Sequence, residues 1–486
     1  MKITMICPRV IDAPLPPLGI LYIAAVLEKE GHKLQVFDVS PDERIKVIEE
    51  IAKFKPDLIG LSVSSTQLNH AKEISNMLRK VLPETPIVCG GVHVTALPVE
   101  TLMELNADFA IIGEGEYSML ELCKKLETGG SLDEVGSLVH KKGDKIVQNK
   151  RRGLIEDLNE LPFPARHLLD FEWYLIPPGP IRGIWLKRAT TLITSRGCPY
   201  SCIYCGSNLI FGRKVRRRSI ENVIAEIEEL KEKYNIDGMW FLDDTFTLNK
   251  KWVVDFCNNL RKNKIELVWG CQARANTIQE DVLIEMKKAG CAQLDVGVES
   301  GSERILKVLQ KKTNPKMIED AFSMAKKVGL RTMASFMLGN PEETMDDINK
   351  TLELAKKIDP DFTLFFFTTP FPGTKLNEMA IENKWIKDED YSKWLVKQTD
   401  SPIMEINFTA EELIEIRSTL QNEFVFKNYI STLRNPSYIL NFLLLLTRYP
   451  RGIVKGAGKA IKSKRVDDII YSILEEYRSR KRTESI

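Results

Sequence analysis

Short apolar segments alternate with amphipathic helical segments over much of this 486-residue chain. In the N-terminal third, the apolar segments expected to form strands are Ile3–Cys7, Leu34–Asp38, Leu58–Ser62, Ile87–Cys89 and Phe109–Ile112. Short buried strands that are joined by helices pair in parallel, because the helices then cover both faces of the sheet. The alternation therefore predicts an α/β domain built on a doubly wound, Rossmann-like sheet.

Four loops at the expected carboxyl ends of these strands are rich in glycine, proline and hydroxyl side chains. They are Pro14–Gly19, Ser62–Thr66, Gly90–Thr95 and Gly113–Glu116. Ligands of doubly wound sheets bind beyond the carboxyl ends of the strands, near the point where the strand order reverses. Small residues let the backbone approach a large flat or anionic ligand closely. These loops therefore predict a ligand site.

A second alternation follows a proline-rich segment and predicts a different α/β fold. After a strand at Thr191–Ser195, further strands are expected at Gly238–Leu242, Leu267–Gln272, Gln293–Val298, Thr332–Leu338 and Phe362–Phe367. Consecutive parallel strands with intervening helices favour a partial (β/α)6, TIM-like barrel, whose reactive groups lie at the carboxyl ends of the strands. The residues that follow these strand ends are Asp243, Asp244, Arg274, Glu299 and Gly339.

Three cysteines lie on the loop that follows the first strand of this barrel. Cys198, Cys202 and Cys205 are spaced so that their thiolates can face one inorganic cluster. Thiolates are the usual ligands of a cubane iron–sulfur cluster, and three of them leave one iron open. The alternatives are a zinc knuckle or scattered core thiols, but structural zinc usually has four ligands and the next cysteine is Cys257. Nine cysteines, three of them clustered, indicate a metal site in a reducing compartment.

The Cys198-x3-Cys202-x2-Cys205 spacing resembles the signature of the radical S-adenosylmethionine (SAM) enzymes, and residues 188–375 resemble their barrel strand by strand. In that family the open iron of a [4Fe–4S] cluster binds SAM, and an electron from the cluster splits SAM to methionine and a 5′-deoxyadenosyl radical. The resemblance implies a set of residues that contact SAM or lie near it: Tyr204, Asp243, Asp244, Arg274, Glu299 and Gly339. The alternative for each is a loop cap or a core residue.

The N-terminal loops resemble those of the cobalamin-binding domain that precedes many radical SAM domains. By this resemblance the contacts to cobalamin come from Ser64, Thr66, Gly90, Gly91, His93 and Glu114. The Asp-x-His-x-x-Gly motif, which supplies a cobalt-ligating histidine in other cobalamin proteins, is absent here, as is common in this subgroup. Ser64 and Thr66 are alternatively caps of the following helix, and His93 alternatively bonds its own backbone.

Changes in pattern along the chain predict four parts. We expect a cobalamin-binding-like domain at residues 1–135, a linker with a hairpin at 136–187, the radical SAM barrel at 188–400 and a helical region at 401–486. Within the barrel, Arg213–Arg218 carries five basic residues in six. This basic run is either a solvated loop or a contact with an anionic substrate or cofactor.

The C-terminal region predicts helices with an apolar and basic tail. Residues 438–446 are strongly apolar, and no acidic residue lies between Ser437 and Arg465. The apolar run is shorter than the ~20 residues that cross a bilayer, but an apolar helix with a basic flank can lie on an anionic membrane surface. The alternative is a helix packed on the barrel or on a partner subunit. Because the chain starts without a signal peptide, we expect a cytoplasmic protein. If the tail lies on a membrane surface, the protein is expected to be peripheral there through residues 438–465.

The predicted function is that of a cobalamin-dependent radical SAM enzyme. In its methylase form, one SAM supplies a methyl group through cobalamin, and a second yields the radical that removes hydrogen from an unactivated carbon of a lipid or other metabolite. The alternatives are a radical SAM cyclase or oxidoreductase that forms C–C, ring or C–O bonds without methyl transfer, and a cluster-bearing sensor without activity. A ferredoxin or flavodoxin is the expected electron donor. The net charge of +2 gives no indication of nucleic acid binding.

Overall fold

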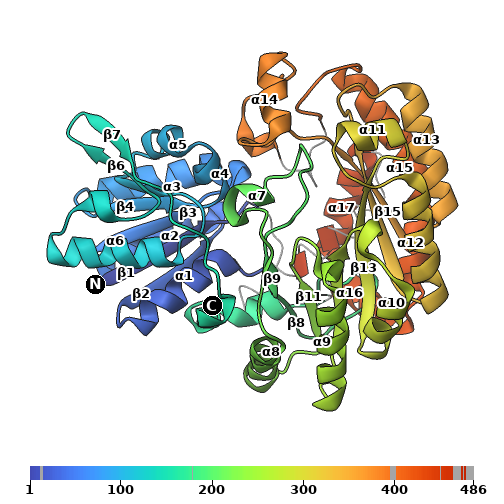
Figure 1. Ribbon diagram of the computed structural model, residues 1–486, viewed down its shortest axis with the longest axis horizontal. Helices are drawn as coiled ribbons and strands as arrows, with labels where there is room; N and C mark the ends of the chain where they lie inside the picture. Colours follow the sequence, from blue (N-terminus) through green and yellow to red (C-terminus); the bar gives the residue numbers. More distant parts are fainter. Residues whose placement is uncertain are drawn as a thin grey trace.

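The computed structural model contains two α/β units followed by C-terminal helices (Figure 1). It describes residues 1–10, 15–177, 179–394, 401–448, 450–463, 472–473 and 476–477. Pro14 and Arg465, which bound segments named above, lie outside this described part. So do residues 395–400, the predicted end of the barrel domain. In Figure 1 the N-terminal unit is blue to teal, and the second unit runs from green to orange.

The N-terminal unit is a seven-stranded sheet in the order β2-β1-β3-β4-β5-β6-β7. Its strands are β1 (Lys2–Pro8), β2 (Lys33–Val39), β3 (Leu58–Ser62), β4 (Ile87–Gly90), β5 (Phe109–Ile111), β6 (Leu138–Lys142) and β7 (Lys145–Gln148). The first five pair in parallel, and their order reverses between β1 and β3.

Helices cover both faces of this sheet. One face carries α1 (Leu18–Lys29) and α6 (Glu116–Thr128), and the other carries α2 (Arg44–Phe54), α3 (Leu68–Val81) and α5 (Pro98–Glu104). The pattern of α3 explains its place, because its buried apolar residues, Leu68, Ala71, Ile74 and Leu78, recur every three or four positions and form one stripe. β3 is buried almost continuously, as a central parallel strand requires. The predicted doubly wound sheet is confirmed.

The hairpin that the sequence places in the linker belongs instead to this sheet. β6 pairs antiparallel with β5, with Val139 opposite Ala110, and β7 pairs with β6. Leu138 and Val139 are fully buried, so the hairpin completes the domain core. The prediction that the linker begins at residue 136 is therefore wrong for this hairpin, because its apolar side chains need the sheet. The other domain limits stay predictions.

The second unit is a six-stranded, all-parallel sheet in the order β15-β14-β13-β12-β11-β8. Its strands are β8 (Ala189–Leu192), β11 (Gly238–Phe241), β12 (Val268–Ala273), β13 (Cys291–Glu299), β14 (Arg331–Leu338) and β15 (Phe362–Phe367). Its helices are α8 (Ile220–Tyr234), α9 (Lys250–Lys262), α10 (Glu280–Lys288), α11 (Glu303–Val308), α12 (Pro315–Val328), α13 (Met345–Ile358) and α14 (Lys375–Glu382). Shorter elements after β8 are β9 (Ser195–Arg196), α7 (Ser207–Phe211) and β10 (Arg216–Arg217). Each strand of the six-stranded sheet pairs with its neighbours in chain order, so the predicted partial barrel is confirmed.

The open edge of the barrel sheet is covered by a helix. α15 (Ala410–Leu433) runs beside β15. The Gln421 side chain accepts a hydrogen bond from the Phe365 N–H (3.2 Å) and donates one to the Thr363 carbonyl (3.1 Å). Asn428 accepts from the Thr363 N–H and donates to the Thr363 carbonyl, both at 3.0 Å. The two side-chain amides therefore replace a neighbouring strand along this edge.

The tail has one packed face and one exposed apolar face. α16 (Pro436–Arg448) and α17 (Pro450–Ser463) follow α15. The Tyr438 ring lies edge-on to Trp185 with 5.6 Å between ring centroids, and Phe442 joins the same apolar cluster. The exposed apolar side chains of α16 are Leu440, Leu443 and Leu444. Within the described ranges, no helix combines the length and the apolar character that a membrane span needs.

Candidate active site

The cysteine loop, which connects β9 to α7, is held at its start and in its middle. Gly197 has a φ of +94°, and a Cβ added there would lie 2.4 Å from the Lys214 carbonyl oxygen, so a glycine is required. In the middle of the loop, the Ile203 N–H donates to the Leu309 carbonyl (3.2 Å). The Ile203 carbonyl accepts from the Leu376 N–H (2.9 Å). The loop is therefore fixed by backbone contacts from two other parts of the barrel.

The structure brings the three cysteines of this loop together. Cys202 is buried, and Cys198 and Cys205 are half-buried. Burial raises the pKa of the Cys205 thiol to about 11, and the charges of Asp244, Cys202 and Cys198 add to the rise, so the three sulfurs lie within electrostatic reach of one another. Across the described residues, no group of three or more His, Cys, Asp or Glu side chains is placed so that it could hold one metal ion. The number and type of the donors, three thiols on one loop, fit a cubane cluster with one open iron better than a structural zinc, which takes four ligands.

Asp243, directly after β11, ties the start of the cysteine loop to the barrel. Its carboxylate accepts from the Thr194 N–H (2.7 Å), the Thr194 hydroxyl (2.5 Å) and the Ser195 hydroxyl (2.6 Å). The Arg217 guanidinium lies 3.7 Å away, and Asp243 is only 1% exposed. The structure thus shows Asp243 as a support of the loop, and its contact with SAM stays a prediction.

Asp244 supports the other end of the loop. Its carboxylate accepts a hydrogen bond of 2.5 Å from the hydroxyl of Ser207, the first residue of α7. Burial raises the pKa of Asp244, although the Ser207 bond opposes the rise. Asp243 and Asp244, which follow β11, therefore hold the two ends of the cysteine loop by hydrogen bonds.

Arg274, which follows β12, contacts one of the cysteines directly. Its guanidinium donates to the Cys202 sulfur (3.4 Å) and lies over the Tyr200 ring, 3.7 Å from the ring centroid. It also donates to the Lys311 carbonyl. Arg274 is buried, so its charge acts on the cluster site with little screening by water. Its predicted place near the site is therefore supported, while a contact with SAM itself stays a prediction.

Glu299, Tyr204 and Lys311 form a second buried polar group beside the cysteines. Lys311 Nζ lies 2.6 Å from Glu299 Oε1 and 3.2 Å from the Tyr204 hydroxyl, which donates to Glu299 at 3.0 Å. Burial, together with the Glu299 charge, raises the pKa of Tyr204 well above its usual value. Glu299 has a φ of +67°, a strained conformation for a residue with a side chain. Lys311 could not be found from the sequence, because it follows a short helix and nothing in the local pattern marks it.

The turn after β14 is built around a carboxylate that the sequence analysis also missed. The N–H groups of Gly339 and Asn340 donate to Glu343 at 2.7 and 3.1 Å, and the Asn340 amide donates to it at 2.8 Å. Burial raises the pKa of Glu343 to about 7, against the effect of these bonds. Gly339 has a φ of +78°, which favours glycine. The contact of Gly339 with adenine stays a prediction.

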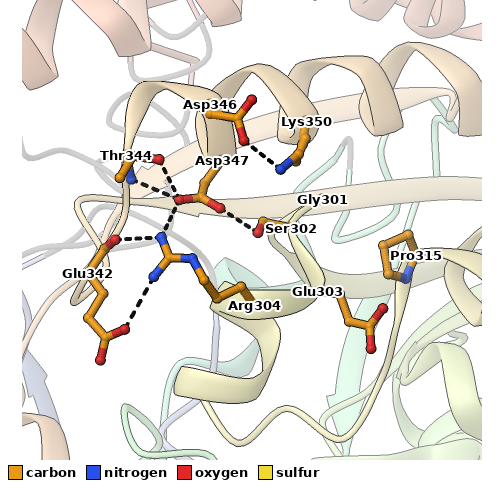
Figure 2. A pocket seen from close by; sticks show the side chains of 10 residues that line it. All are labelled: Gly301, Ser302, Glu303, Arg304, Pro315, Glu342, Thr344, Asp346, Asp347 and Lys350. Carbon is orange, nitrogen blue, oxygen red and sulfur yellow. Dashed lines mark hydrogen bonds and ion pairs between the residues drawn. The ribbon is translucent and has the colours of Figure 1, made fainter.

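A polar groove of about 610 Å³ lies beside this turn (Figure 2). Asp347, in the first turn of α13, accepts from the hydroxyls of Ser302 (2.5 Å) and Thr344 (2.7 Å) and pairs with Arg304 (2.5 Å). Burial raises the pKa of Asp347, but these donors outweigh it and hold the pKa well below its usual value. No residue that lines the groove belongs to the cysteine loop. We therefore assign these groups to the support of the barrel rim.

In the N-terminal unit, the loop after β3 is organised by a cap. Ser64 forms a capping box with Gln67, whose side chain accepts from the Ser64 N–H at 2.9 Å. The hydroxyls of Ser64 and Thr66 are 3.3 Å apart. The capping alternative is confirmed for Ser64, and contacts of Ser64 and Thr66 with cobalamin stay predictions.

The loop after β4 contains a short helix, α4 (Val92–Ala96), that the sequence analysis treats as loop. Gly91 has a φ of +111°, and a Cβ there would lie 2.6 Å from the Val63 carbonyl oxygen, whereas Gly90 has room. His93 Nδ1 lies 2.9 Å from the Ser65 hydroxyl, and its ring is edge-on to Tyr391 at 4.9 Å. A bond to its own backbone, the alternative for His93, is therefore wrong for Nδ1. Burial lowers the pKa of His93 to about 4, so the ring is neutral. Contacts of Gly90, Gly91 and His93 with cobalamin stay predictions.

Glu114 lies at the boundary between the two units and is already surrounded by donors. Its carboxylate accepts from Arg196 (2.8 Å), Arg216 (2.7 Å) and the Ile155 N–H (2.9 Å). Both carboxylate oxygens therefore face the barrel and the linker. A contact of Glu114 with cobalamin stays a prediction.

The basic run Arg213–Arg218 is exposed at its start and buried toward its end. Arg216 and Arg218 are 4% exposed, and Arg218 pairs at 2.5 Å with Glu226, which is also buried. For these two arginines both alternatives, a solvated loop and a contact with an anionic ligand, are wrong, because buried carboxylates of the same chain neutralise them. Arg213 and Lys214 are exposed, so the solvated-loop alternative holds for these two residues.

The loops predicted to hold cobalamin face the cysteine loop. Val92 of α4 packs near Gly206, the residue that follows the last cysteine. Ala96 and Leu209, from α4 and α7, both lie against Gly373. Figure 1 shows α4 and α7 next to each other where the two units meet. Two candidate cofactor sites, one in each unit, therefore share one boundary.

A three-cysteine loop on a partial parallel barrel, turned toward the switch-point loops of a doubly wound domain, is the architecture of radical SAM enzymes with a B12-binding domain. Family models agree with this class. The model of the radical SAM superfamily matches residues 192–355, and that of the B12 binding domain matches residues 9–123.

Comparison with individual proteins places the chain in the same class. It is 32% identical over 471 residues to the uncharacterized methyltransferase PH0819 of Pyrococcus horikoshii, covering 94% of this chain and 98% of that protein. It is 28% identical to an anaerobic magnesium-protoporphyrin IX monomethyl ester cyclase of Rubrivivax gelatinosus, over 74% of this chain and 65% of that protein. Its fold is similar to that of the cobalamin-dependent SAM radical enzyme OxsB with aqua-cobalamin and SAM bound, with a TM-score of 0.73, 18% identity, and coverage of 99% of this chain and 75% of that one.

The chain therefore belongs to the radical SAM enzymes that carry a B12-binding domain. The predicted resemblance is confirmed, and the sensor alternative is set aside in favour of an enzyme. The cofactors of this class are a [4Fe–4S] cluster, SAM and cobalamin, and the donor set of the cysteine loop fits the first of them.

Proposed function

We propose that this enzyme is a cobalamin-dependent methylase that replaces a hydrogen on an unactivated carbon of a lipid or other metabolite with a methyl group. The observation that carries the proposal is the contact between α4 and α7, which sets the loops expected to hold cobalamin against the cysteine loop. A methyl donor and a radical source must reach the same substrate carbon, so the two cofactor sites need to share one cavity. Similarity over nearly the whole chain to an uncharacterized methyltransferase supports methyl transfer.

In this proposal the chain's own residues hold and shield the reacting groups. Cys198, Cys202 and Cys205 ligate the cluster, and Arg274 fixes the Cys202 sulfur. When bound, the cluster supplies the electron that cleaves SAM, and cobalamin carries the methyl group. The buried pair Lys311 and Glu299, with the other groups around the loop, keeps water from the site, which protects a carbon radical from quenching. A ferredoxin or flavodoxin supplies the two electrons of each turnover.

A radical SAM cyclase or oxidoreductase is the second candidate, since one relative of this chain is a cyclase. The two reactions differ in their by-products. Methylation consumes two molecules of SAM and releases one S-adenosylhomocysteine, one methionine and one 5′-deoxyadenosine per product. A cyclase that uses SAM only as the radical source releases methionine and 5′-deoxyadenosine without S-adenosylhomocysteine.

The test uses the full-length enzyme, reconstituted anaerobically with cluster and cobalamin, and SAM that is deuterated in its methyl group. Extracts of the source cells, separated into lipids and water-soluble metabolites, serve as the substrate pool. We expect S-adenosylhomocysteine and 5′-deoxyadenosine in equal amounts and one extracted compound that gains a labelled methyl group. 5′-Deoxyadenosine without S-adenosylhomocysteine would instead identify the cyclase. A Cys202→Ala variant is expected to form no 5′-deoxyadenosine and no methylated product, and a Cys257→Ala variant, which changes a buried helix thiol, is expected to form both by-products.

We further propose that the exposed face of α16 rests on an anionic membrane, which would favour a lipid substrate. Leu440, Leu443 and Leu444 are each about half exposed or more, and the sequence around them is basic and free of acids. Co-sedimentation with vesicles tests this. We expect binding to vesicles of phosphatidylglycerol, weak binding to phosphatidylcholine, and loss of binding in a Leu443→Ser/Leu444→Ser variant. Equal recovery of the variant and the unchanged protein would contradict membrane contact.

A further inference from the structure

Two arginines lie directly opposite each other on the short ladder that brackets the cysteine loop. β9 pairs antiparallel with β10, and Arg196 is the cross-strand partner of Arg216. The segment between these two strands contains the loop that bears the three cysteines, followed by α7. Like charges that face each other across antiparallel strands destabilise the pairing, and burial strengthens their repulsion. Both arginines are buried, so the ladder needs a nearby negative charge.

That charge comes from the other unit. Glu114 Oε1 accepts from Arg196 Nη1 at 2.8 Å, and Glu114 Oε2 accepts from Arg216 Nη1 at 2.7 Å, so one carboxylate bridges both arginines. Glu116, the first residue of α6, pairs with the other terminal nitrogen of Arg196 at 2.6 Å. All four side chains are at most 5% exposed. Two positive and two negative buried charges therefore balance across the boundary.

The surroundings show that this group is built into the boundary and is not a chance contact. The Arg196 guanidinium lies 5.1 Å from the centroid of the Tyr22 ring, in α1, and 5.4 Å from that of the Phe211 ring, in α7. Burial lowers the pKa of Arg196, but the charges and hydrogen bonds of Glu116 and Glu114 outweigh it and raise the pKa above its usual value. Arg216 also donates to the Ile155 carbonyl at 2.7 Å, which brings in the segment between the units.

We propose that Glu114 is a positioning residue for the iron–sulfur cluster. It holds together the two strands that bracket the cysteine loop, so the loop keeps its cluster-binding shape only while the cobalamin-binding domain is docked on the barrel. The same carboxylate thereby fixes the position of the cluster relative to the loops expected to hold cobalamin. This role acts through Arg196 and Arg216 and requires no contact between Glu114 and either cofactor.

The test compares the reconstituted full-length enzyme with a Glu114→Gln variant. Glutamine keeps the shape of the side chain and removes the charge that bridges the arginines. We expect iron release to a chelator, followed by loss of the cluster absorbance, to become about tenfold faster or more, because the loop opens more often. Hydrogen exchange followed by mass spectrometry should show faster exchange confined to residues 194–217.

Two matched variants separate this role from general loosening. Glu156→Gln removes an exposed ion pair with Lys214, in the same basic run, and is expected to leave iron release unchanged. Glu226→Gln removes a buried carboxylate that pairs with Arg166 and Arg218. It is expected to lower the melting temperature without accelerating iron release. If Glu226→Gln accelerates iron release as much as Glu114→Gln does, the proposal is wrong.

A double variant tests the charge-bridging role directly, because a second substitution would not slow iron release if Glu114 only stabilised the fold in general. In Glu114→Gln/Arg216→Gln one of the two opposed charges is gone together with the bridge, and Arg196 keeps its pair with Glu116, so the ladder no longer repels itself. We expect iron release to return to within about threefold of the unchanged enzyme, a clear departure from additivity. Should Glu114→Gln alone fail to fold, the double variant is expected to restore soluble, cluster-containing protein. A double variant no better than the single one in cluster retention or in soluble yield would overturn the proposal.

Discussion

The two sides of the barrel mouth are fixed in different ways. On the cysteine side, Asp243 bonds residues 48 and 49 positions earlier, and Glu114 bonds Arg196 and Arg216, 82 and 102 positions later. On the β14 side, Glu343 bonds backbone groups three and four positions earlier. The β14 turn can therefore form with its own segment, whereas the cysteine loop reaches its final shape only after distant parts of the chain, and a second domain, have come together.

The largest effect is expected from replacing Cys202, the buried cysteine of the loop. Cys202→Ala removes the buried ligand that Arg274 contacts, so a stable [4Fe–4S] cluster should not assemble and formation of 5′-deoxyadenosine should fall below detection. Iron and sulfide content, the electron paramagnetic resonance spectrum after reduction, and product analysis check this. The matched change is Cys257→Ala, at a fully buried thiol on α9, which should keep the cluster. Wild-type turnover by Cys202→Ala would refute the assignment of the site.

A change at Asp243 removes hydrogen bonds that hold the start of the cysteine loop. Asp243→Asn keeps the size of the side chain but turns an amide N–H toward donors from Thr194 and Ser195, so at least one buried hydrogen bond is lost. Losing part of a buried network around a charge costs about 2–4 kcal/mol, and cluster content should fall with it. Urea unfolding and iron content are the measurements.

Asp244→Asn is the matched control for Asp243→Asn. Asp244 accepts a single side-chain bond, from Ser207, and the amide oxygen of an asparagine can still accept it, so the substitution should cost about 1 kcal/mol or less. If the two variants lose stability equally, Asp243 is not the main support of the loop.

The difference between the two sides also explains how far the sequence could predict the site. The strands and the cysteine loop follow from local patterns, such as the buried run of β3 and the spacing of Cys198, Cys202 and Cys205, and they were predictable. Asp243 was also found, because it follows a strand end, but its partners Thr194 and Ser195 could not be, since they lie in a segment that precedes it by nearly fifty residues.

The basic run shows the same limit more sharply. Five basic residues in six indicate a charged surface as long as only neighbours in the sequence are considered. Arg216 and Arg218 are buried because they pair with Glu114 and Glu226, respectively. These carboxylates become their neighbours only in the folded chain. The β14 side offered a usable local signal, because Thr344 and Asp347 stand three positions apart at a helix start and form a capping box.

On the β14 side a pH dependence is expected from Glu343. Its pKa is raised by burial to about 7, so between its unfolded value near 4.5 and 7 the folded chain binds more protons than the unfolded chain. Stability therefore falls as the pH rises through this window, by about 1–3 kcal/mol. Glu343→Gln should flatten that part of the profile, as urea midpoints between pH 5 and 7.5 would show. An equal slope in the variant would assign the dependence to other groups.

Asp347 is expected to give a smaller pH-dependent effect than Glu343, with the opposite sign. Hydrogen bonds from Ser302 and Thr344 outweigh burial and lower its pKa, so the folded chain binds fewer protons than the unfolded chain below the usual value of 3.8. Its contribution, about 1–2 kcal/mol, is complete above about pH 5 and is lost as the pH falls. Asp347→Asn should therefore lower the urea midpoint at pH 6 and approach the unchanged enzyme near pH 3. Because its partners Ser302 and Thr344 line the polar groove and do not belong to the cysteine loop, cluster content should stay the same in this variant (Figure 2). A loss of iron on this substitution would show that the two sides of the mouth are coupled after all.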